Sequence, residues 1–308
     1  MKKILVTGGA GFIGSHTCLT LLENKFNLIV VDSFTNSSER SLDKVIELLE
    51  IKYSDIKERI KIFKGDVKNE DWLNEIFVNC KKENNPIMGV IHFAGLKAVA
   101  ESVENPLSYW EGNLVSSISL LKVMQKNKCF IIVFSSSATI YKAVSELIKE
   151  DFEKEPINPY GQTKLTIEKM LHNLYESDKK KWKVINLRYF NPIGAHYSGI
   201  IGESPLGQPN NIFPIIGKVA MGLIVKLNIF GNDWPTRDGT CIRDYIHVMD
   251  LAEGHVKALN FLLENKPCFL NINLGTGKGT TVLELVKSFQ NINKIKIPYE
   301  FAERRIGD

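Results

Sequence analysis

The sequence has few cysteines and no long apolar run, and these two features argue against a disulfide-rich, a metal-binding or a membrane-spanning protein. Its 308 residues include five cysteines, an odd number at wide spacing without a CxxC pair, which argues against a disulfide framework or a metal site. No apolar run approaches the roughly 18 residues that a membrane-spanning helix needs. The N-terminal run Ile4–Val6 is too short for a signal peptide and predicts a buried strand. We therefore expect a cytoplasmic protein without a membrane or metal partner.

An excess of one charge is also lacking. The chain carries 39 Lys and Arg against 35 Asp and Glu, a formal net charge of +4. An excess this small and scattered does not indicate nucleic-acid binding. The length suits about two domains of roughly 150 residues and allows a large core that needs no disulfides.

The first 190 residues alternate apolar runs with amphipathic stretches. The runs predict strands at Lys3–Val6, Leu28–Val31, Ile60–Phe63, Gly89–Phe93, Phe130–Phe134 and Lys183–Leu187. The stretches predict helices at Ile13–Glu23, Arg40–Glu50, Trp72–Lys81, Pro106–Lys126 and Tyr160–Leu174. Continuous apolar strands are typical of a parallel sheet covered by helices on both faces. Residues 1–190 are therefore expected to form an α/β domain, a Rossmann-type doubly wound parallel sheet.

The character of the chain changes after Asn191. Closely spaced Gly and Pro residues between positions 191 and 211 indicate a loop. Shorter elements follow, namely helix Ile212–Met221, strand Leu227–Phe230, helix Asp250–Leu263, strand Phe269–Leu274 and helix Thr281–Phe289. We expect residues 191–308 to form a smaller C-terminal α/β lobe that binds substrate over the edge of the sheet.

A glycine-rich loop follows the first predicted strand. Gly8, Gly11 and Gly14 lie between that strand and the first predicted helix, where glycine allows a tight turn and close approach to a pyrophosphate. Asp32 ends the second strand, where a carboxylate accepts hydrogen bonds from ribose hydroxyls and repels a 2′-phosphate. The pattern favours NAD over NADP as the ligand.

Two further strand ends support the same ligand. Asp66 and Val67 follow the third strand, and Phe93-Ala94-Gly95 follows the fourth. Each could be ordinary strand termination. Because the carboxyl ends of parallel strands meet at one edge, we expect them to form one crevice with the glycine loop.

The fifth predicted strand is followed by three serines, of which Ser137 is the last. Tyr160 and Lys164 lie further along the chain, in the next predicted helix. A serine-rich strand end can be a simple cap, but here it precedes a tyrosine and a lysine four residues apart, on one face of a helix. The same TyrxxxLys spacing recurs at Tyr53 and Tyr175, which we interpret as solvated surface residues.

The three side chains suggest acid–base chemistry on a hydroxyl group. A tyrosine has an ordinary pKa of about 10, so a base near neutral pH needs a positive charge that favours the phenolate. Lys164 and the nicotinamide of NAD⁺ would supply that charge, and Ser137 could relay the substrate proton. Ser137, Tyr160 and Lys164 are therefore the predicted catalytic residues.

On these motifs the chain resembles the UDP-glucose 4-epimerases, within the extended short-chain dehydrogenase/reductase superfamily. The resemblance runs from Lys3 to Asp308 and is most specific in Val90–Val99 and Arg243–Asp250. It implies a homodimer that uses the helices at Pro106–Lys126 and Tyr160–Leu174. It also implies a bound NAD that serves to invert C4 of UDP-galactose or UDP-glucose through a transient 4-keto sugar.

The resemblance also assigns binding residues. For NAD they are Phe12, Ile13, Asp32, Asn36, Asp66, Val67, Phe93, Ala94, Gly95, Lys97, Asn113, Tyr160, Lys164 and Phe190. For the UDP-sugar they are Ser137, Tyr160, Asn191, Asn211, Ile212, Phe230, Arg243, Arg305 and Asp308. Members of the family continue for some tens of residues past the Arg-Arg-x-Gly-Asp segment that ends this sequence, so we expect the C-terminal lobe to be truncated.

Two other functions fit parts of the pattern. A nucleotide-sugar 4,6-dehydratase has the same fold but needs an Asp-Glu pair after the strand-end serine, where this chain has Ala138 and Thr139. A non-catalytic NAD-binding protein would not need Ser137, Tyr160 and Lys164 together.

Overall fold

The central strands of the main sheet bury both of their faces. In β1 (Lys3–Thr7), Ile4 and Val6 pack into one core, while Leu5 between them packs into another. In β2 (Asn27–Asp32), Val30 joins the first core and Ile29 the second. Because side chains alternate across a strand, one continuous apolar run fills two cores.

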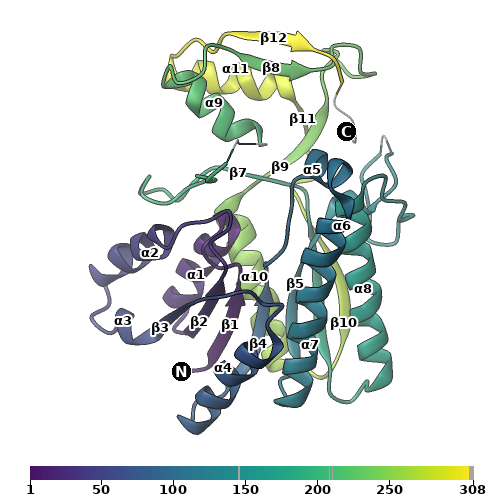
Figure 1. The fold of residues 1–308 in the computed structure, drawn as a ribbon. Coiled ribbons are helices and arrows are strands. Elements are labelled where there is room, and N and C mark those ends of the chain that lie inside the picture. The colour runs from purple at the N-terminus through teal and green to yellow at the C-terminus, as the bar shows by residue number, and fades with distance from the viewer. Residues whose placement is uncertain (145, 208, 210, 305–308) are drawn as a thin grey trace.

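The computed structural model describes residues 1–144, 146–207, 209 and 211–304. Its seven parallel strands have the order β10-β6-β5-β4-β1-β2-β3 (Figure 1). The other five are β3 (Ile60–Lys64), β4 (Ile87–His92), β5 (Ile131–Ser137), β6 (Lys183–Tyr189) and β10 (Phe269–Leu274). The strand order reverses between β1 and β4, and doubly wound folds bind ligands at that point. The predicted fold class is confirmed.

Helices cover both faces of this sheet. The first core lies under α1 (Phe12–Glu23), α2 (Arg40–Glu50) and α10 (Val248–Glu264). The second lies under α4 (Glu70–Lys82), α7 (Ser116–Lys126) and α8 (Pro159–Ser177). The single helix expected over Pro106–Lys126 is α6 (Pro106–Tyr109), a π-helical stretch η1 (Trp110–Val115) and then α7. The short α3 (Ile56–Arg59), α5 (Val99–Glu104) and η2 (Ala138–Ile140) were not predicted.

One part of the predicted C-terminal lobe belongs to the main sheet. Strand β10 pairs with β6 in parallel, and Leu251 and Leu259 of α10 pack into the first core. The sequence placed both elements in the smaller lobe because they follow the glycine- and proline-rich loop. The chain instead leaves the sheet after β6 and returns to it with residues 248–274.

The smaller lobe stands beyond the carboxyl ends of the strands (Figure 1). It has its own core, where α9 (Ile212–Ala220) and α11 (Val282–Asn293) pack on a parallel pair, β8 (Leu227–Phe230) and β12 (Tyr299–Ala302). A three-stranded sheet, β11-β9-β7, lies between this lobe and the main sheet. Its strands are β7 (Asn191–Ile193), β9 (Ile242–His247) and β11 (Gly279–Thr281), which are too short or too polar for the sequence pattern to reveal.

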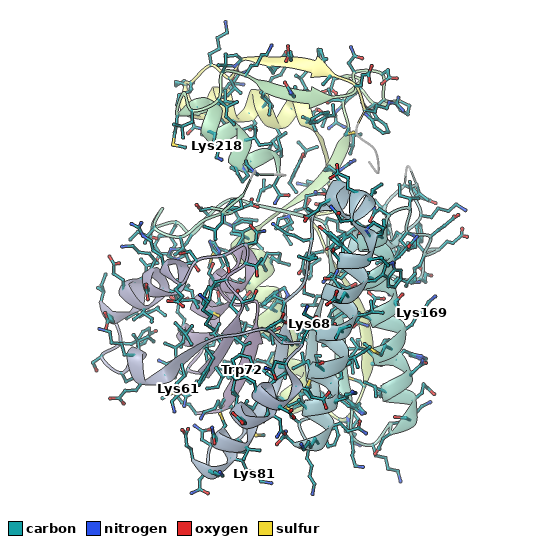
Figure 2. The ribbon with its side chains drawn as sticks, viewed as in Figure 1. Lys61, Lys68, Trp72, Lys81, Lys169 and Lys218 are labelled. Carbon is teal, nitrogen blue, oxygen red and sulfur yellow. The ribbon has the colours of Figure 1, made fainter. Side chains whose placement is uncertain are left out.

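The charged side chains are spread over the molecule. The lysines labelled in Figure 2 lie on separate elements, among them Lys61 on β3, Lys81 on α4, Lys169 on α8 and Lys218 on α9. Within the described residues, no helix combines the length and the apolar character needed to cross a bilayer.

The packing of α10 against the main sheet can be tested by urea unfolding. Leu259 is fully buried in the first core, so Leu259→Ala should lower the free energy of unfolding by about 2–5 kcal/mol. Phe261 lies on the same helix but is 43% exposed, and Phe261→Ala should cost less than about 1 kcal/mol. Equal midpoints for the two variants would contradict the assignment.

Candidate active site

The glycine loop packs backbone to backbone against the neighbouring strand end. Gly8 has φ +69°, and a Cβ there would lie 2.7 Å from the amide nitrogen of Ala94. A Cβ on Gly14 would lie 2.3 Å from the carbonyl oxygen of Gly8. Helix α1 begins directly after Gly11, where no described side chain caps it. Its first N–H groups, from Phe12 onward, therefore offer a place for an anion such as a pyrophosphate.

Asp32 fixes this loop to the second strand. Its Oδ2 accepts a hydrogen bond from the amide of Ala10 at 2.9 Å. Its Oδ1 accepts from the amide of Phe34 and from the hydroxyl of Ser37, both at 2.9 Å. A carboxylate offers about four acceptor positions, so three bonds leave it one direction for a ligand hydroxyl. The buried Asp32 is thus held in place and still able to accept from a ribose.

The ends of β3 and β4 complete the same edge. The amides of Phe93 and Ala94 both donate to the carbonyl of Thr7, at 3.0 and 3.1 Å, which holds the β4 loop against β1. Val67 is buried after β3, while the neighbouring Asp66 is exposed and accepts from the amide of Lys68. Phe12 and Ile13, which begin α1, therefore lie at the carboxyl edge of the strands together with the loop residues Asp66, Val67, Phe93 and Ala94.

Asn113 joins the β4 loop to helix α8. It is buried, accepts from the amide of Leu96 at 2.7 Å and donates to the hydroxyl of Thr163 at 2.9 Å. Thr163 lies next to Lys164, so Asn113 positions the loop of Gly95 and Lys97 beside the predicted catalytic helix.

The three predicted catalytic residues lie together and are buried. Ser137 ends β5, and its hydroxyl accepts from the amide and the hydroxyl of Thr139, at 3.2 and 2.9 Å. Asn158 caps α8 by accepting from the amide of Gly161, which places Tyr160 in the first turn. The ammonium of Lys164 donates to the carbonyl of Ser135 at 2.8 Å and lies 5.9 Å from the centre of the Tyr160 ring.

Burial governs the pKa of Tyr160 in the chain alone. Burial raises it above its usual value, and the hydrogen bond with Ser137 offsets only part of that effect. Burial also lowers the pKa of Lys164 to about 8, although the negative charge of Glu168 acts to raise it. In the chain without a cofactor, burial outweighs the hydrogen bond with Ser137, and the expected lowering by Lys164 and NAD⁺ together stays a prediction.

A cleft of about 1540 Å³ opens between the main sheet and the smaller lobe. Its wall includes Ala138 and Thr139, directly after Ser137, and Asn158, at the start of α8, so it reaches the predicted catalytic residues. Predicted binding residues from both parts of the chain line it, namely Asn36, Gly95, Lys97, Phe190, Asn191, Asn211, Ile212, Phe230 and Arg243. Arg305 and Asp308 lie outside the described residues.

Several polar residues of this region carried no role in the sequence analysis. Glu203 is buried in the cleft wall and accepts from Lys97 at 3.4 Å and from Asn211, so it joins a predicted cofactor residue to a predicted substrate residue. Glu168 and Arg188 form a buried ion pair behind the predicted catalytic residues. The available signal was an arginine in the mainly apolar strand Lys183–Tyr189, because a buried arginine needs a partner.

The other two TyrxxxLys matches are not solvated as expected. Tyr53 is half-buried against the first core and Tyr175 against the second. Both rings cover apolar surface, and neither lies at the carboxyl edge of the strands.

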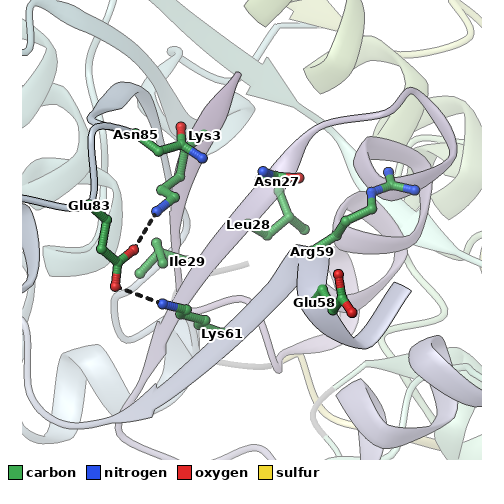
Figure 3. Close-up of a pocket in the computed structure, with 9 residues that line it drawn as sticks. All are labelled: Lys3, Asn27, Leu28, Ile29, Glu58, Arg59, Lys61, Glu83 and Asn85. Atoms are coloured by element: carbon green, nitrogen blue, oxygen red, sulfur yellow. Dashed lines mark hydrogen bonds and ion pairs between the residues drawn. The ribbon is translucent and has the colours of Figure 1, made fainter. Parts of the chain in front are cut away.

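A second, smaller pocket lies at the opposite end of the main sheet. It has a volume of about 170 Å³ and is lined by the first residues of β1, β2 and β3 (Figure 3). There Glu83 accepts hydrogen bonds from Lys3 at 3.2 Å and Lys61 at 2.9 Å, so these charges are already paired. None of the described residues predicted for the active site lines this pocket.

Comparisons with known proteins agree with this arrangement. The NAD dependent epimerase/dehydratase family matches residues 4–275. The UDP-glucose 4-epimerase of Bacillus subtilis is 48% identical over 307 residues, which cover 99% of this chain and 86% of that protein. A bifunctional UDP-glucose 4-epimerase and UDP-xylose 4-epimerase of Pisum sativum is 47% identical. That match covers 100% of this chain and 86% of the pea protein.

A solved structure has the same fold. The crystal structure of UDP-glucose 4-epimerase from Bifidobacterium longum, in complex with NAD+ and UDP, matches with a TM-score of 0.92 and 43% identity. The match covers 100% of this chain and 88% of that chain. The chain thus belongs to the NAD dependent epimerase/dehydratase family and, within it, to the UDP-glucose 4-epimerases.

Proposed function

We propose that this chain is an isomerase that binds NAD and interconverts UDP-galactose and UDP-glucose at C4 through a transient 4-keto sugar. One observation carries the proposal: a single cleft is lined by Gly95, in the loop that packs against Gly8, by Thr139, which binds Ser137, and by polar residues of the smaller lobe. The relatives named as UDP-glucose 4-epimerases, similar over the whole chain, support the same reaction.

The residues present fit a dinucleotide cofactor. The uncapped start of α1, reached by a backbone turn in which side chains at Gly8 and Gly14 would clash, suits a pyrophosphate. Asp32 keeps one acceptor direction for the adenosine ribose and would repel a 2′-phosphate, which favours NAD over NADP. When bound, NAD supplies a reversible hydride acceptor for C4 of the sugar.

Tyr160 would take the proton from the O4 hydroxyl of the sugar, with Ser137 relaying it. Because burial raises the pKa of Tyr160, its phenolate needs a nearby positive charge to form near neutral pH. Lys164, with a pKa of about 8, keeps most of its charge at pH 7 and lies one helical turn away. Lys164 would therefore stabilise the phenolate and also contact the nicotinamide ribose.

The smaller lobe would hold the UDP-sugar. Arg243 offers a guanidinium for the diphosphate and Phe230 a ring face for the uracil, and both line the cleft. Asn191, Asn211 and Ile212 line the same wall. The sugar ring must turn about its link to the diphosphate to present its other face, and the volume of the cleft leaves room for that turn.

We also propose that the enzyme is a cytoplasmic homodimer. All five cysteines are free and four of them are buried, as suits a reducing compartment. Exposed apolar side chains, Val103, Leu107, Val115 and Ile118, lie along α5, α6, η1 and α7 on one flank of the molecule (Figure 1). A second copy that covered this flank would remove them from water.

The reaction is tested by incubating the purified protein with UDP-galactose and no added nucleotide. We expect UDP-glucose to appear without net build-up of NADH, because C4 epimerisation leaves the cofactor as it began. Chromatography of the sugar nucleotides and absorbance at the NADH band report both quantities. Accumulation of NADH, or of a 4-keto-6-deoxy sugar as a dehydratase would make, would exclude the proposal.

The base is tested by Tyr160→Phe, with Tyr175→Phe as the matched control. Loss of the phenol at position 160 should lower turnover by about 100- to 10,000-fold, because no other group takes the O4 proton. Bound NAD should stay at the wild-type amount, as measured after acid release. Tyr175 lies late in the same helix, packed against Phe269, so its variant should keep wild-type turnover. Activity in Tyr160→Phe would show that the base is misassigned.

The dimer is tested by light scattering of Leu107→Glu and Ile118→Glu, on α6 and α7. A charge on the proposed interface should shift the protein towards monomers, since it would be buried without a partner. The control Leu223→Glu alters a residue that is 69% exposed on the smaller lobe and should leave the dimer intact. A wild-type protein that is monomeric at micromolar concentration rules the dimer out.

A further inference from the structure

Helix α8 presents a third ionisable residue on the face that carries Tyr160 and Lys164. Glu168 lies one turn beyond Lys164, and all three residues are buried against the sheet. Opposite them, Ser136 of β5 is in register with Arg188 of β6. The structure thus brings a buried carboxylate and a buried guanidinium to the place where β5, which ends at Ser137, meets α8, which carries Tyr160 and Lys164.

The carboxylate of Glu168 binds both strands. Its Oε1 accepts from the hydroxyl of Ser136 at 2.5 Å and from Nε of Arg188 at 2.9 Å, while its Oε2 accepts from Nη2 of Arg188 at 2.6 Å. Ser136 lies between Ser135, whose carbonyl holds the ammonium of Lys164, and Ser137. One bond between Ser136 and Glu168 therefore fixes the strand end that carries Ser137 to the helix that carries Tyr160 and Lys164.

The same network continues to the wall of the substrate cleft. Nη1 of Arg188 donates to the hydroxyl of Tyr141 at 2.8 Å and to the carbonyl of Glu150 at 2.9 Å. The Tyr141 hydroxyl donates to Asn273 at 2.7 Å, and Asn273 donates to the carbonyl of Ile148 at 3.0 Å. Tyr141, Ile148 and Asn273 line the cleft. Arg188 thus links the catalytic helix to the loop and the strand end that face the substrate.

A buried ion pair of this kind is a poor device for stability alone. Removing both charges from water is costly, and apolar side chains of similar volume often stabilise a protein as well or better. What the pair supplies is a fixed geometry, because a bidentate arginine–carboxylate contact allows little movement. The rate of a positioned proton transfer depends on such geometry, since a displacement of about 1 Å can cost roughly 100-fold.

We propose that Glu168 and Arg188 are positioning residues, which hold Lys164 and Tyr160 in register with Ser137 through the bond from Ser136 to Glu168. The proposal rests on the proposed function, because it concerns the geometry of the same catalytic group. Neither residue lines the cleft, so both act through others rather than on the sugar.

The charge of Glu168 also acts on Lys164. It opposes the effect of burial on the pKa of Lys164, which is about 8. His92 of β4 also interacts electrostatically with Lys164, and burial lowers the pKa of His92 to about 3, so it is neutral. Loss of the carboxylate would leave the charge of Arg188 unpaired and would lower the pKa of Lys164 further.

The first test compares Glu168→Gln with Lys169→Gln, which alters an exposed lysine on the outer face of the same helix (Figure 2). In Glu168→Gln we expect kcat for UDP-galactose to fall about 10- to 100-fold with little change in KM. The alkaline limb of the kcat profile should move to lower pH, because Lys164 loses its proton earlier. Lys169→Gln should match the wild type in kcat, KM and pH profile.

Two further variants separate positioning from stability. Ser136→Ala keeps the ion pair but cuts its bond to the catalytic strand, so kcat should fall while the unfolding midpoint changes little. If Glu168→Gln does not fold, the kcat of Ser136→Ala tests the positioning role in its place. The double variant Glu168→Gln with Arg188→Met removes both charges and should recover stability without recovering kcat. A double variant with wild-type kcat and pH profile would show that the pair is only structural.

Crystal structures of the same variants give a readout that does not depend on turnover. The distance from Lys164 Nζ to the Ser135 carbonyl, 2.8 Å in the present structure, should be kept in Lys169→Gln and lost in Glu168→Gln. If the wild type does not convert UDP-galactose, the proposed function fails, and this distance still decides the positioning role. Unchanged distances in both Glu168→Gln and Ser136→Ala would overturn it.

Discussion

The contact between the loop after β1 and the loop after β4 is the constraint on which the rest of the site depends. The amides of Phe93 and Ala94 donate to Thr7, and the space beside Gly8 is too small for a side chain. This contact lies where the strand order reverses, so it sets the width of the crevice in which a dinucleotide would lie. Asp32 ties the second strand to the same loop, and Asn113 ties the fourth to helix α8.

Around that crevice, burial disfavours the charged forms of the two predicted catalytic groups. It raises the pKa of Tyr160 and lowers that of Lys164 to about 8, so two groups with nearly equal proton affinity in water are moved apart. A bound dinucleotide would add positive charge on the same side. The chain alone therefore has a neutral tyrosine, and its use as a base depends on the complete site.

The fold could be predicted from the sequence because its pattern is local. Continuous apolar runs such as Leu28–Val31 identified strands buried on both faces, and the glycines after β1 identified the loop. The elements that were missed are short or polar, such as β9. Strand β10 was predicted with its bounds, but the loop before it hid the sheet to which it belongs. When a strand pairs with another strand far away in the sequence, as β10 does with β6, its own residues do not indicate which strand is its partner.

For this protein, the sequence by itself determined the doubly wound α/β class, the cofactor loop and the family, because residue type and spacing are enough to specify them. It also predicted a catalytic role for Ser137, at the end of β5, and for Tyr160 and Lys164, in the first turns of α8. Only the tertiary structure decided that β10 joins the main sheet and α10 packs on it, and that Glu168 and Arg188 meet behind the predicted catalytic residues. It decided the direction of the Tyr160 pKa as well, because burial is a property of packing that spacing along a chain does not encode.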